Sequence, residues 1–111
     1  MYRLLLAVTV LLLSTSISYA GFAEGLAAYD RGDYATAARE YRQAAEQGEA
    51  RAQTLLGLLY SRGEGVPQDY AEAFKWLHQA AAQGTSRAQG ILGGMYYFGE
   101  GVPQDYVEAF K

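Results

Sequence analysis

The chain has no cysteine, one histidine and two prolines among its 111 residues. Without cysteine it can form neither a disulfide nor a zinc–thiolate site, and thiolate catalysis is excluded. A single histidine excludes a multi-histidine metal site within one chain. Basic residues number 9 against 12 acidic ones, and the net charge of −3 argues against a cationic surface for nucleic acid. We therefore expect no metal, no cofactor and no nucleic-acid partner.

The composition is that of a globular protein rather than a disordered one. Hydrophobic residues make up 50% of the chain, aromatic residues 14% and charged residues 19%. The length allows at most one small domain. Because burial is incomplete at this size, every element must contribute to one core.

Residues 1–20 have the pattern of a cleavable signal peptide. Arg3 gives a short positive start, an apolar run follows, and Ser18 and Ala20 are the small residues of a cleavage site after Ala20. Cleavage removes one basic residue and lowers the formal charge from −3 to −4. We expect a periplasmic or secreted protein with no stable membrane span after cleavage. The alternative is a membrane anchor, for which the apolar run is short against a hydrocarbon layer of ~30 Å.

The remainder of the chain repeats with a period of 36 residues. Residues 34–69 and 70–105 share 21 of 36 positions, which excludes a chance match. The sequence therefore predicts repeat 1 at 34–69, repeat 2 at 70–105 and the start of a truncated repeat 3 at 106–111. Residues 21–33 are predicted to form an N-terminal capping helix.

Each repeat is predicted to contain two helices. In repeat 2 they span about 70–83 and 86–98, where apolar residues recur every three or four positions. Asp69 precedes the first helix as an N-cap. Gly57 and Gly93 lie in the middle of the second helices at a cost of about 1 kcal/mol each relative to alanine. We expect a neighbouring helix backbone to pack directly on them.

The helices are joined by connectors of fixed length. The segment Gly-Glu-Gly-Val-Pro-Gln-Asp occurs at 63–69 and again at 99–105. It has no glycine pattern of the phosphate-binding type. The predicted fold class is all-α, an α-α superhelix (solenoid) of antiparallel helix hairpins with a 36-residue period.

The repeated motif resembles that of a known family. The unit Tyr-Ala-Glu-Ala-Phe-Lys-Trp-Leu…Ala-Ala-Ala-Gln-Gly…Gly-Glu-Gly-Val-Pro-Gln-Asp, from Tyr70 to Asp105, resembles a Sel-one-like repeat, a relative of the tetratricopeptide repeat. The resemblance is close across 34–111 and weaker across 22–33. It implies an α-solenoid, an adaptor or scaffold role and, in bacteria, functions at the envelope or in host contact.

Functional side chains in a solenoid are expected where the repeats differ, because shared positions are used for stacking. We expect a groove lined by the first helix of each repeat. The predicted partner-binding residues there are Arg39, Arg42, Lys75, Trp76 and His78.

These positions have plainer interpretations as well. His78 matches Arg42 and is interpreted as a solvated surface residue rather than a catalyst. Trp76 is either a partner contact or a packing residue between helices. Tyr97 and Phe98, which replace Ser61 and Arg62, are expected to pack between repeats.

The predicted function is that of an exported protein-interaction module with a protein or peptide partner, and not of an enzyme. One alternative is an envelope hydrolase related to cell-wall or β-lactam chemistry, although the relatives linked to that chemistry are cysteine-rich. Another is a non-binding partial gene product. Because Lys111 falls inside repeat 3, the chain is interpreted either as truncated or as self-associating through its open C-terminal repeat.

Overall fold

The computed structural model describes residues 21–111, and these contain helices and no strand. Residues 21–30 are helical. The later helices are α2 (Tyr34–Glu46), α3 (Ala50–Arg62), α4 (Tyr70–Ala82), α5 (Ser86–Phe98) and α6 (Tyr106–Ala109). The predicted all-α class is confirmed, as are the helices expected near 70–83 and 86–98, and a helix is present within the predicted capping segment 21–33. The predicted signal peptide, 1–20, lies outside the described residues.

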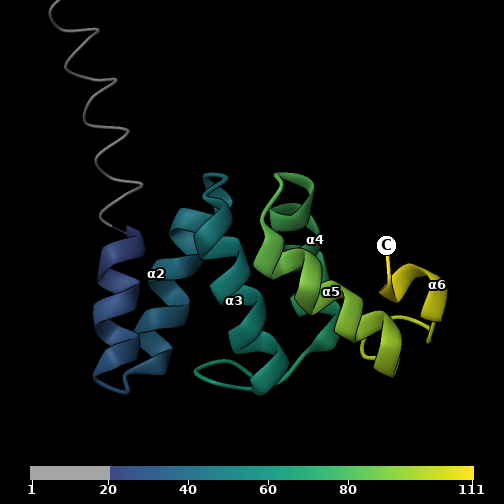
Figure 1. The fold of residues 1–111 in the computed structure, drawn as a ribbon. Coiled ribbons are helices and arrows are strands. Elements are labelled where there is room, and N and C mark those ends of the chain that lie inside the picture. The colour runs from purple at the N-terminus through teal and green to yellow at the C-terminus, as the bar shows by residue number, and fades with distance from the viewer. Residues whose placement is uncertain (1–20) are drawn as a thin grey trace, which may run out of the picture.

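The helices form a solenoid in which each one stacks on its neighbours in the chain. Helix α3 packs against both α2 and α4, and α5 packs against α4 and α6. Figure 1 shows this row of helices, with 21–30 at one end and α6 at the other. The buried faces join into one core, which includes Tyr41, Leu56, Leu59, Trp76 and Leu77.

Aspartate caps and left-handed glycines set the ends of these helices. The Asp69 carboxylate accepts a hydrogen bond from the backbone N–H of Glu72 at 3.1 Å, and Asp105 caps α6 in the same way. Gly63 ends α3 with a φ of +67° and Gly99 ends α5 with a φ of +70°. Such positive φ values favour glycine, so the chain reverses at fixed positions.

The mid-helix glycines lie where neighbouring helices approach most closely. A Cβ atom at Gly57 would lie 2.6 Å from Leu77 Cγ and 3.2 Å from the carbonyl oxygen of Ala73 in α4. At Gly93 it would lie 2.7 Å from the carbonyl oxygen of Ala109 in α6. The expected close packing on both glycines is therefore confirmed.

The connector between repeats is held by hydrogen bonds to the preceding helix. The N–H of Asp69 donates to the carbonyl oxygen of Tyr60 at 2.9 Å, and Gln68 Nε2 donates to the carbonyl oxygen of Ser61 at 2.9 Å. The second connector repeats both bonds. The connectors are thus defined structures, as the sequence predicts.

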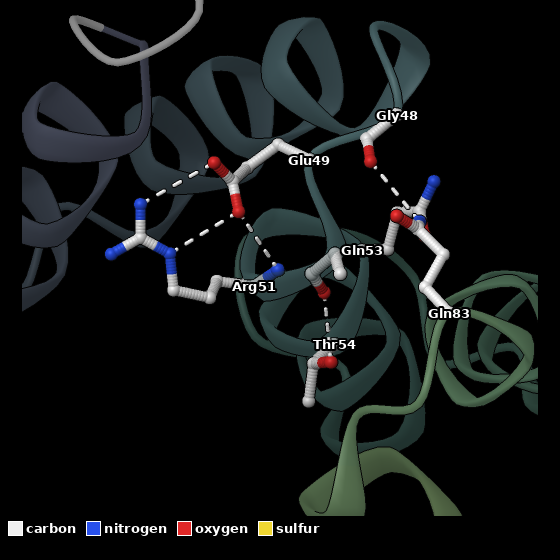
Figure 2. Close-up of polar contacts among 7 residues, drawn as sticks. Gly48, Glu49, Arg51, Gln53, Thr54 and Gln83 are labelled. Atoms are coloured by element: carbon white, nitrogen blue, oxygen red, sulfur yellow. Dashed lines mark hydrogen bonds and ion pairs between the residues drawn. The ribbon is translucent and has the colours of Figure 1, made fainter.

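Glutamine side chains link the two repeats at the opposite end of the helices. Gln83 Nε2 donates to the carbonyl oxygen of Gly48 at 3.0 Å and to Oε1 of Gln53 at 2.9 Å (Figure 2). Gln53 in turn donates to the carbonyl oxygen of Ala45 at 3.1 Å. Because Gln53 is 3% exposed, these bonds satisfy a buried amide and fix how α4 is placed on α3.

Candidate functional site

Two apolar cavities lie side by side on the face formed by residues 21–30, α3 and α5. The first has a volume of about 210 Å³ and the second about 340 Å³. Both are lined by Leu26, Leu55 and Arg87. We call the two cavities together the α3 groove. Its remaining lining residues are Phe22, Tyr29, Tyr41, Arg51, Thr54, Leu58, Leu59, Arg62 and Thr85.

Helical spacing along α3 explains the groove. Arg51, Leu55, Leu58 and Arg62 recur every three or four residues, so they share one face of the helix. The opposite stripe of α3 is in the core. Helix α3 therefore has a second apolar stripe, which places leucines in the groove and one arginine at each end of it.

The floor of the groove is rigid and apolar. Tyr41 is 2% exposed, and its ring packs against the backbone of Gly25, where a Cβ atom would lie 2.4 Å from Tyr41 Cε1. Burial raises the pKa of Tyr41 to about 12. Leu26 is 40% exposed at the edge. The groove therefore offers apolar surface above a well-packed layer.

Two of the groove arginines have acidic neighbours. Arg51 donates to both carboxylate oxygens of Glu49, at 3.2 and 3.3 Å, and its guanidinium lies 4.1 Å from the centre of the Phe22 ring. The hydrogen bonds from Arg51 lower the pKa of Glu49. Arg62 lies 3.6 Å from Glu64. These pairs hold the guanidinium groups close to the chain's own carboxylates.

The predicted contact residues on α2 lie outside this groove. Arg39 donates to the hydroxyl of Thr36 at 3.5 Å on an exposed face. Arg42 donates to the hydroxyl of Tyr60 in α3, and its guanidinium is 5.6 Å from the centre of the Tyr60 ring. Arg42 therefore links α2 to α3 and is only partly available to a partner.

The predicted contact residues on α4 also lie outside the groove. Trp76 is 6% exposed in the core, and its Nε1 has no hydrogen-bond partner within residues 21–111. Lys75 is 4.9 Å from the Trp76 ring and forms an ion pair with Glu72 at 3.1 Å. His78 is exposed, and its ring lies 5.7 Å from that of Phe74. The packing interpretation of Trp76 is the one that matches its burial.

The predicted partner groove and the α3 groove are different surfaces. The α3 groove is lined mainly by residues 21–30, α3 and α5, and not by the first helices of the predicted repeats, α2 and α4. Whether Arg39, Arg42, Lys75, Trp76 and His78 contact a partner stays a prediction.

A second apolar surface lies at the C-terminal end of the solenoid. The ring of Tyr97 lies 5.0 Å from Phe98, 5.2 Å from Tyr106 and 6.2 Å from Phe110. Tyr97 thus packs on the next repeat as expected, but it remains 42% exposed, and Phe98 is 68% exposed. We call Tyr97, Phe98, Tyr106, Val107 and Phe110 the C-terminal aromatic cluster.

The described residues offer little for metal chemistry or for spanning a membrane. Within 21–111, no three histidine or acidic side chains gather closely enough to hold a metal ion. No helix in the same range combines the length and the apolar character that crossing a bilayer requires.

Sequence reasoning missed the most central residues of the groove, Leu26, Leu55 and Arg87. A signal was present for Arg87. Arg51 and Arg87 are equivalent in the repeat, but the acidic residue two positions before Arg51 is Glu49, whereas Thr85 stands before Arg87. That difference changes the charge around a repeated arginine.

Comparison with protein families gives a direct match to the repeats. The Sel1 repeat model matches residues 22–49, 50–85 and 86–111. Its units begin one helix earlier than the predicted repeats, so that each unit starts with a helix that lines the α3 groove. None of the curated proteins searched matches the chain.

Solved structures share the same fold. A protective antigen of uropathogenic Escherichia coli strains, which displays an SLR fold, is 39% identical with a TM-score of 0.80 over 86% of this chain. A Sel1 repeat protein from Oxalobacter formigenes is 36% identical with a TM-score of 0.69 over 69% of this chain. The aligned regions are only 21% and 22% of those longer chains. The protein therefore belongs to the Sel1 repeat family, whose members are generally protein-interaction modules.

Proposed function

We propose that the chain is an exported adaptor or scaffold of the bacterial envelope that binds a protein or peptide partner in the α3 groove. The single observation that carries this proposal is the groove itself. Its two adjoining cavities are lined by the exposed Leu26, the half-buried Leu55 and arginines, above a buried floor that includes Leu59 and Tyr41. Exposed apolar surface with a polar rim is typical of protein-binding sites.

Shape also supports a peptide or a protein segment as the occupant. The cavities follow one another along α3 and are shared by three helices of the stack. A single small molecule would fill one cavity, whereas a chain can place successive side chains in both.

Photo-crosslinking from single positions tests the interaction. A photoreactive residue at Leu26, on the groove, is expected to form adducts with envelope proteins in living cells. The same residue at Gln43, exposed on α2, is the matched control and should form none of those adducts. Equal adducts from both positions, or none from Leu26, would refute binding in the groove.

Export is tested separately with the full chain. The signal-peptide pattern in 1–20 predicts a product that begins at Gly21 in the periplasmic or extracellular fraction. Mass spectrometry of the fractionated protein measures that mass directly. Recovery of the intact chain from the cytoplasm or the membrane would overturn the export proposal and leave the groove unaffected.

We further propose that two copies associate through the C-terminal aromatic cluster. The rings of Tyr97 and Tyr106 lie 5.2 Å apart, and the side chains of the cluster are exposed on α5 and α6. Light scattering is expected to show a concentration-dependent dimer that Phe110→Glu abolishes. A monodisperse monomer at high concentration would contradict this proposal.

A further inference from the structure

Arg87 is the one groove arginine that the repeat pattern leaves without its acidic partner. In the equivalent position of repeat 1, Arg51 is held by both oxygens of Glu49 (Figure 2). In repeat 2 the acid is replaced by Thr85, whose side chain makes no capping hydrogen bond. Within the described part of the chain, Arg87 forms no side-chain hydrogen bond or ion pair. The substitution therefore leaves a guanidinium with its hydrogen-bonding capacity unused.

The position of Arg87 is as informative as its lack of a partner. It is exposed at the start of α5 and lines both cavities of the α3 groove. Leu26 and Leu55 lie beside it in both cavities, so apolar surface and an unpaired cation share one edge. Arg62 lines the first cavity and Arg51 the second. Arg51 and Arg62 are paired with Glu49 and Glu64, so Arg87 supplies the unpaired positive charge of the groove.

This pattern contrasts with the charge of the rest of the molecule. The chain carries a net charge of −3, which disfavours acidic ligands at long range. The unpaired guanidinium of Arg87 gives the groove a local preference of the opposite sign. Guanidinium binds carboxylates through two parallel hydrogen bonds, and the bonds are stronger where apolar neighbours exclude water.

We propose that the α3 groove binds an acidic peptide segment, with an aspartate or glutamate side chain on Arg87 and a neighbouring large apolar side chain in the cavity between Leu26 and Leu55. This inference rests on the proposed function of the groove as a protein-binding site and names the chemistry of its partner. A segment with an internal acidic side chain fits better than a chain end, because Arg87 lines both cavities and an internal residue has neighbours on both sides to fill them.

The repeat itself supplies the most selective variant. Thr85→Glu copies Glu49 of repeat 1 into repeat 2 and is expected to pair with Arg87 as Glu49 pairs with Arg51. It adds an N-cap acceptor at an α5 start that has none, so folding is preserved. Arg87→Ala removes the guanidinium outright. Arg39→Ala, which removes an exposed arginine of α2 outside the groove, is the matched control.

The experiment measures fluorescence anisotropy of a short labelled peptide titrated with the purified exported protein. The probe carries one phenylalanine flanked by glutamates, and the comparison peptide has glutamine at each glutamate. The glutamate peptide is expected to bind about tenfold more tightly or better, with affinity falling as salt rises. Thr85→Glu and Arg87→Ala should each remove that preference, and Arg39→Ala should keep it.

The outcomes separate this inference from the function on which it rests. Equal binding of both peptides, blocked by Leu26→Asp, would overturn the acidic preference while the groove remains a binding site. If the Thr85→Glu protein still binds the glutamate peptide more tightly than the glutamine peptide, the role of Arg87 is also overturned. Failure of both peptides, together with no crosslinks from position 26, would refute the groove altogether. Binding of anionic lipid vesicles in place of the peptide would refute a peptide partner.

Discussion

Gly57→Ala is the substitution whose effect the structure predicts most sharply. In an exposed helix, alanine stabilises relative to glycine by about 1 kcal/mol. At Gly57 the new Cβ atom would lie 2.6 Å from Leu77 Cγ and 3.2 Å from the carbonyl oxygen of Ala73. Leu77 is fully buried and the carbonyl is backbone, so α4 must move away from α3. Overpacking of this kind costs about 1–3 kcal/mol. We expect a net destabilisation of about 1 kcal/mol.

Gly90→Ala is the matched control in α5. Nothing lies within 4 Å of a Cβ atom at Gly90, so alanine keeps its helix advantage and stabilises by about 1 kcal/mol. Urea unfolding followed by circular dichroism measures both free energies. The two midpoints should move in opposite directions with an unchanged m-value. If Gly57→Ala stabilises the protein as much as Gly90→Ala does, the inferred helix contact is wrong.

Two further predictions concern a helix cap and a buried tyrosine. Asp69→Ala removes the oxygen that accepts from the N–H of Glu72 and should lower the free energy of unfolding by about 1 kcal/mol, while Asp69→Asn restores most of it in thermal unfolding. Burial raises the pKa of Tyr41 from 10.0 to about 12, so the folded state keeps a proton that the unfolded state releases. Stability should therefore fall as pH rises from about 10 to about 12. Tyr41→Phe should reduce that fall, and exposed Tyr106→Phe should not; equal slopes for the two variants would contradict the assignment.

The fold could be predicted from the sequence because the same signals occur twice. The apolar stripe, the aspartate before each helix and the glycine after it all recur at an interval of 36 residues. Gly57 and Gly93 predict close helix packing because a mid-helix glycine is costly without it. Each of these signals is local or nearly so, and local signals determine the helices of a solenoid.

The groove could not be predicted in the same way because it depends on how helices from separate parts of the chain stack. The sequence shows that two helices alternate, but both α2 and α3 carry apolar stripes, and either could face inwards. The groove side chains Leu26 and Leu55 come from helices that are far apart in the sequence. Only the stacking of α2 between residues 21–30 and α3 brings them together. Trp76 shows the same limit, since its burial depends on contacts outside its own helix.

Differences between repeats are informative when the structure shows no packing reason for them. The change from Glu40 to Trp76 adds a large buried ring to the core, so folding accounts for it. The change from Glu49 to Thr85 has no such explanation in packing. It removes a capping hydrogen bond and an ion pair, and the Thr85 side chain makes no cap hydrogen bond in their place. Proteins depart from locally favourable choices mainly at functional positions. The loss of an ion pair beside a shared apolar cavity therefore supports the proposal that Arg87 binds a ligand there.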